Sequence, residues 1–104
     1  MKVLLDECLP RYLKGALTGH EVQTVQEANW SGRKNGELLA LAEPTFGAFL
    51  TSDQNLRYQQ NLRGRRIAII ELPTNRLPAI KLLVPGILDA LAVVRPGDYL
   101  QIKE

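Results

Sequence analysis

The sequence predicts an α/β protein: a single three-layer α/β/α domain, residues 1–104, built around a mainly parallel sheet. Short apolar runs typical of buried strands alternate along the chain with segments of helical periodicity. Two of these runs end abruptly in carboxylates, as strands do where an open α/β sheet carries its chemistry. A length of 104 residues suits one domain with a core of its own.

The first quarter of the chain indicates a compact β-α-β unit. Residues 3–5 are an apolar run, which predicts a buried strand over residues 2–5. Pro10 suits the first turn of a helix, where its missing N–H costs nothing, and apolar side chains at helical spacing extend this helix over residues 10–17. Alternating polar and apolar side chains then predict a short strand over residues 21–25.

The middle of the chain begins with residues 26–34, which are irregular and predict an exposed loop. A strong helix follows over residues 35–43, with Asn35 as its N-cap and Pro44 stopping it. Residues 48–51 are again apolar and predict a third strand.

The last part of the chain indicates a short helix over residues 55–62 and a buried strand over residues 67–70. Residues 77–94 carry a long helical pattern, in which Pro85 and the glycine after it predict a kink or a division into two pieces. An edge strand over residues 99–102 ends the chain.

Composition sets limits on the class of protein. Hydrophobic residues make up 45% of the chain and charged residues 23%, which excludes intrinsic disorder. A single Cys forms no internal disulfide, and neither a signal peptide nor a run of about 20 apolar residues is present, so we expect a cytoplasmic protein without a membrane partner. A net charge of +2 does not by itself indicate nucleic-acid binding.

Carboxylates follow two of the predicted strands. Asp6 and Glu7 come directly after the first strand, Asp53 comes after the third, and Glu37 lies in the first turn of the helix between them. If these strands are neighbours, Asp6 and Asp53 emerge side by side. Clustered carboxylates repel one another and usually bind a cation, and oxygen ligands favour Mg²⁺ or Mn²⁺, which suits phosphodiester hydrolysis.

Each acid also has a purely structural interpretation. Asp53 can cap the following helix, Glu37 can favour the helix dipole, and Glu7 can be a solvated loop residue. Asp6 is harder to explain in this way, because it closes a run whose start should be buried.

Basic residues flank the predicted acidic pocket. The candidates for contact with nucleic-acid phosphates are Arg33, Lys34, Arg57, Arg65 and Arg66. Tyr58 or Trp30 would be able to stack an unpaired base. The alternative is a solvated charged face, with Trp30 as a hydrophobic lid over the core.

Other candidates for chemistry are weaker. His20, the only His, is expected at the surface or at the entry to a strand. Cys8 is expected to be a small buried side chain. Neither standard spacing of a glycine-rich phosphate loop is present.

Three motifs resemble the successive motifs of the small single-domain PIN-like family. They are LDECLP at residues 5–10, NGELL at residues 35–39 and LTSDQNL at residues 50–56. The resemblance implies a three-layer fold with a parallel sheet and an Mg²⁺- or Mn²⁺-dependent ribonuclease that cleaves single-stranded RNA, often as the toxin of a toxin–antitoxin pair. It implies that Asp6, Glu37 and Asp53 are the catalytic metal-site acids, with Glu7 adjacent.

The chain also departs from the family pattern. Where relatives often carry Asp-x-Glu and Asp-x-Asp, it has Asn35 before Glu37 and Asn55 after Asp53. Amides are neutral ligands, so metal affinity should fall and a second metal is less favoured. We therefore expect Asp6 and Asp53 to hold one ion, assisted by Asn55, while Glu37 positions or deprotonates the attacking water.

Two other functions remain open at this stage. One is a non-catalytic PIN-like module that binds RNA or protein. The other is a phospho-acceptor signalling domain. One observation argues against this alternative: the predicted fourth strand leads into Glu71, where such a domain is expected to have a hydroxyl residue. The candidate partners are single-stranded RNA, an antitoxin protein and, in a homodimer, a second copy of the chain.

Overall fold

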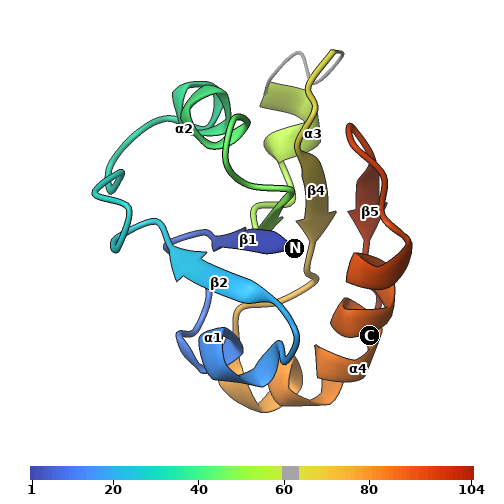
Figure 1. Cartoon of the computed structure of the whole chain (residues 1–104). Helices are drawn as coiled ribbons and strands as arrows, with labels where there is room; N and C mark the ends of the chain where they lie inside the picture. The colour runs from blue at the N-terminus through green and yellow to red at the C-terminus, as the bar shows by residue number, and fades with distance from the viewer. Residues whose placement is uncertain (60–63) are drawn as a thin grey trace.

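The computed structural model describes residues 1–59 and 64–104. Within these residues one sheet of parallel strands runs through the protein in the order β2-β1-β3-β4-β5 (Figure 1). The strands are β1 Lys2–Leu5, β2 Glu21–Thr24, β3 Ala48–Thr51, β4 Ala68–Glu71 and β5 Tyr99–Gln101. Every strand pair is parallel, which confirms the predicted fold class.

Helices cover both faces of the sheet, giving three layers (Figure 1). They are α1 Tyr12–Ala16, α2 Asn35–Ala42, α3 Leu56–Gln59 and α4 Leu77–Val93. Side chains of α1 and α4 belong to one hydrophobic cluster with the sheet, and side chains of α2 and α3 belong to the other. None of the helices in the described part of the chain is long and apolar enough to cross a membrane.

The alternation of side chains along each strand explains the two clusters. Leu5 and Leu50 are register partners and pack on the α1–α4 face, whereas Leu4 and Phe49, one residue earlier, pack on the α2–α3 face. All four are buried. The central strands β1 and β3 are therefore apolar on both faces at these positions, as the apolar runs of the sequence indicated.

Three expected local features are wrong. Asn35 is the first residue of α2 rather than its N-cap, which is Lys34. The division of residues 77–94 into two pieces is wrong, because α4 continues through Pro85 as one helix, while the alternative of a kink at Pro85 stays a prediction. The fourth strand begins and ends one residue later than expected and includes Glu71.

The predicted helix over residues 55–62 is α3 in its described part, and residues 60–62 lie outside the described residues.

The strand order positions the candidate site. From β1 the chain passes to β2 on one side, and it later returns to β3 on the other side of β1. The carboxyl ends of β1 and β3 thus meet where the direction of winding reverses, which is where open α/β sheets bind ligands.

Candidate functional site

Asp6 lies at the carboxyl end of β1, directly beside β3. Leu5 and Leu50 are register partners, and the Asp6 backbone N–H donates to the Leu50 carbonyl oxygen at 3.0 Å. This bond extends the ladder one step and sets Asp6 next to Thr51, the last residue of β3. The prediction that these two strands are neighbours ending at the same edge is confirmed.

The hydroxyl of Thr51 joins the two aspartates. Its side chain is fully buried, and its Oγ1 donates to Asp6 Oδ2 at 2.7 Å. The same oxygen accepts the backbone N–H of Asp53 at 3.0 Å. One buried hydroxyl therefore fixes the Asp6 carboxylate and the start of the turn that carries Asp53.

Further neutral donors hold both carboxylates. Asp6 Oδ1 accepts the Glu7 backbone N–H at 2.8 Å. Asp53 Oδ1 accepts the Asn55 backbone N–H at 3.0 Å, and its Oδ2 accepts the Asn35 side-chain amide at 3.1 Å. Asp53 thus stabilises the turn before α3, as the structural interpretation required, and also contacts the start of α2. Hydrogen bonds of this kind fix the orientation of metal-binding carboxylates.

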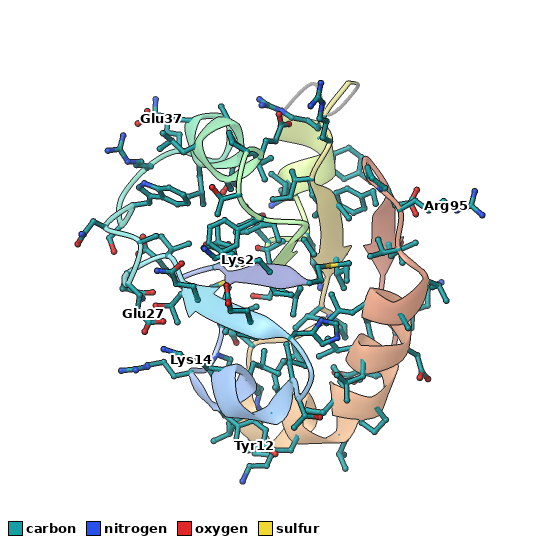
Figure 2. All side chains as sticks on the ribbon, in the orientation of Figure 1. Lys2, Tyr12, Lys14, Glu27, Glu37 and Arg95 are labelled. Atoms are coloured by element: carbon teal, nitrogen blue, oxygen red, sulfur yellow. The ribbon has the colours of Figure 1, made fainter. Side chains whose placement is uncertain are left out.

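Glu7 and Glu37 point to other partners. Glu7 Oε1 accepts the backbone N–H of Gly32 at 2.7 Å in the loop before α2. Glu37 forms an ion pair with Arg33 and is exposed on the outer side of α2 (Figure 2). It lies two positions after Asn35, about 200° around the helix axis from the residue that contacts Asp53. The structure therefore brings Asp6 and Asp53 together but does not bring Glu37 to them.

The Asp6–Asp53 pair fits a hard cation. No Lys, Arg or His among the described residues forms an ion pair with either carboxylate. Oxygen donors of this kind suit Mg²⁺ or Mn²⁺, and magnesium is commonly held by one or two carboxylates together with substrate phosphate. Across residues 1–59 and 64–104 no group of three or more His, Cys, Asp or Glu side chains is placed to hold a metal. At most two acids of the described residues would therefore be available to one ion, and water or a phosphate ligand would have to complete its coordination.

The predicted basic residues surround α2 unevenly. Lys34 and Arg66 are exposed. Arg33 is paired with Glu37, while Arg65 contacts Glu43 at 3.5 Å and donates to the Gly36 carbonyl oxygen at 3.4 Å. The side chain of Arg57 lies outside the described residues.

Sequence reasoning missed Thr51 and misplaced Cys8. Thr51 is the one polar residue in the apolar β3 and lies two positions before Asp53, a spacing that would have indicated it. Cys8 is exposed rather than buried, and its Sγ accepts the Ser52 hydroxyl at 3.0 Å at the rim of the site. The turn after β1 carries it out of the core. Trp30 packs edge-on against Phe46, with ring centroids 6.0 Å apart, and so covers the core.

Comparison with known proteins identifies the family. A family model described as a PIN-like domain matches residues 1–68, which include β1, β3 and both aspartates. Searches of curated proteins and of solved structures gave no match. The match covers more than half of the chain and agrees with the parallel α/β fold, so the chain belongs to the PIN-like domain family.

Proposed function

We propose that this protein is a metal-dependent ribonuclease that cleaves single-stranded RNA, with Asp6 and Asp53 as its metal ligands. The observation that carries the proposal is the Thr51 hydroxyl, which links the two aspartates at the switch point of the sheet, where neither forms an ion pair with a described residue. Family membership supports a nuclease-type site but does not specify the substrate.

The chain's own residues would do the following. Asp6 and Asp53 would hold Mg²⁺ or Mn²⁺, which supplies a Lewis acid that polarises the scissile phosphate when it is bound. Thr51 and Asn35 would keep the two carboxylates in place. Lys34 and Arg66, both exposed, would bind phosphates along the strand.

The part of Glu37 in positioning water stays a prediction. In this structure its carboxylate is held by Arg33, so it would act only if Arg33 exchanged Glu37 for a phosphate of the RNA. Glu37→Gln tests this role directly: an unchanged cleavage rate would remove Glu37 from the mechanism.

The main test is cleavage of an end-labelled single-stranded RNA by the purified protein. We expect cleavage with Mg²⁺ or Mn²⁺, none in EDTA, and none from Asp6→Asn or Asp53→Asn, since the amide keeps the volume and removes the charge. Asp89→Asn is the matched control, because Asp89 is exposed on α4 and should leave cleavage unchanged. Full activity in either site variant would refute the assignment.

The second candidate is an RNA-binding module without catalysis. It is favoured by the small number of acids at the site, since the described residues contain no three-acid group. Such a module would bind the labelled RNA equally well in EDTA and never cleave it. In both cases Lys34→Ala combined with Arg66→Ala should weaken RNA binding and make it less sensitive to salt. The slope of the logarithm of the binding constant against the logarithm of the salt concentration should fall by about 0.7 for each phosphate that the protein no longer neutralises.

The family resemblance extends the first proposal to a toxin that an antitoxin protein neutralises. Induced expression of the wild-type chain in a bacterium should then arrest growth, and expression of Asp6→Asn should not. Equal growth in the two cultures would exclude the toxin role under those conditions.

A further inference from the structure

Another carboxylate lies one strand beyond the candidate site, on β4. Thr51 of β3 and Glu71 of β4 are register partners. Asp6 lies beside Thr51 on the other side, because Leu5 and Leu50 are register partners and each is followed by one of these two residues. Asp6, Thr51 and Glu71 thus form a row along the carboxyl edge of the sheet. Two strand spacings, roughly 10 Å in all, separate the ends of that row.

Glu71 is a buried acid held by hydrogen bonds. Only 5% of its surface is exposed, and its Oε1 accepts the Tyr99 hydroxyl at 2.7 Å. Its Oε2 accepts the Gln101 side-chain amide at 3.1 Å. A buried carboxylate needs such donors, and each oxygen retains a second lone pair as an acceptor.

Glu71 is one of the residues that line an open polar cavity of about 390 Å³ at the carboxyl edge of the sheet. Gln54 forms the wall toward the candidate site, since it directly follows Asp53, and its Nε2 donates to the Pro73 carbonyl oxygen at 3.1 Å. The remaining wall is formed by β5 and the residues after it. The full lining is Gln54, Glu71, Pro73, Gln101, Ile102, Lys103 and Glu104.

We propose that this cavity, termed the Glu71 pocket, binds an unpaired guanine of the RNA next to the scissile phosphate. The proposal rests on the proposed function and names the base that the site selects. Gln54, which lines the pocket, directly follows Asp53 in the sequence, so a strand whose phosphate met the aspartates would be able to place a neighbouring base in the pocket.

Guanine follows from the chemistry of the pocket. An ionised carboxylate only accepts hydrogen bonds, and guanine presents two adjacent donors, N1–H and the N2 amino group, on its Watson–Crick edge. Adenine and cytosine each present one amino group there, and uracil presents one N–H. The amides of Gln54 and Gln101 add groups that can meet the remaining polar atoms of the base.

The test measures binding of three fluorescent heptaribonucleotides, UUUGUUU, UUUAUUU and UUUCUUU, to the wild-type protein in EDTA. A two-bond match should make the guanine oligonucleotide bind roughly 5- to 100-fold more tightly than the adenine one. Glu71→Gln should abolish this preference and retain binding of UUUAUUU. Glu21→Gln is the matched control, because Glu21 is exposed on the edge strand β2, and it should keep the preference.

A second measurement does not depend on a variant that folds. Guanosine monophosphate, added to the ¹⁵N-labelled wild-type protein, should shift the side-chain amide signals of Gln54 and Gln101, and adenosine monophosphate should not. Equal affinity for the three oligonucleotides, or a preference that survives in Glu71→Gln, would overturn the guanine pocket. Unmoved amide signals would also overturn it.

The outcomes separate this proposal from the proposed function. Metal-dependent cleavage without a guanine preference refutes the pocket and leaves the ribonuclease. A guanine preference without cleavage retains the pocket and favours the binding module. No binding to any of the oligonucleotides in EDTA refutes the pocket, and the cleavage assay with Mn²⁺ then decides the ribonuclease separately.

Discussion

Replacing Thr51 by Val tests whether one hydroxyl organises the site. The substitution keeps the shape of a fully buried side chain and removes two hydrogen bonds, to Asp6 Oδ2 and from the Asp53 N–H. A hydrogen bond to a charged group contributes about 1.5–3 kcal/mol, and a buried N–H left unpaired costs about 1–3 kcal/mol. Because Asp53 is only half-buried, we expect a total loss of about 2–4 kcal/mol in the free energy of unfolding.

The matched control is Thr51→Ser, which keeps the hydroxyl and removes one methyl group, at a cost of about 1 kcal/mol. Thermal unfolding should place the Val variant roughly 8–20 °C below the wild type, with the Ser variant between them. Calorimetric titration with Mn²⁺ should show affinity reduced roughly 10- to 100-fold in the Val variant and largely kept in the Ser variant. A Val variant as stable as the Ser variant, with unchanged Mn²⁺ affinity, would refute the role of the hydroxyl.

Four other substitutions test further features of the structure. Asn35→Asp replaces an amide donor 3.1 Å from Asp53 by a carboxylate. Calorimetry should therefore show a melting temperature below that of the wild type without metal, and a larger increase in melting temperature when Mn²⁺ is added. Asn55→Asp, at an exposed position, should change both quantities in the same direction but by less. The hydrogen bond from Lys14, with that from the Thr24 backbone, lowers the pKa of Glu27 from 4.5 to about 2. The stabilising effect of the ionised Glu27 is therefore complete above pH 4.5 and is lost as the pH falls through about 2. Urea denaturation should show that the difference in the free energy of unfolding between the wild type and Glu27→Gln becomes smaller over that pH range. A difference that stays constant with pH would contradict this prediction. Pro85→Ala should raise the free energy of unfolding by about 1–3 kcal/mol, because it restores a missing N–H inside α4. A lower free energy of unfolding, measured by urea denaturation, would contradict this prediction.

The strands could be predicted from sequence because their signal is local. Residues 3–5 and 48–50 are buried on both faces, so each is an unbroken apolar run that ends close to the end of its strand. The polar residue that follows each run then marks the edge. This is why Asp6 and Asp53 could be placed together before the structure was known.

Other features depend on tertiary contacts that a local pattern does not contain. Asn35 is a residue type that often caps helices, but here it is the first residue of α2 and its side-chain amide donates to Asp53 at the end of β3. Pro85 predicts a break, but it lies on the exposed side of α4, where water can satisfy the carbonyl group that it frees. Burial of Ile80 and Ile87 against the sheet keeps the helix continuous on the other side.

Some acids of this protein form ion pairs with arginines, and others are held only by neutral hydrogen-bond donors. Glu37 is neutralised by an arginine in the loop just before its helix and Glu43 by Arg65, so each needs nothing from outside the chain. Asp6 and Asp53 are held only by neutral donors within the described residues, which fixes their geometry and leaves their charge. Such a pair repels itself and also repels RNA phosphates, so a module that only bound RNA would gain nothing from it. A bound cation would remove both repulsions at once, and for this reason we propose a metal-dependent enzyme rather than a simple binding module.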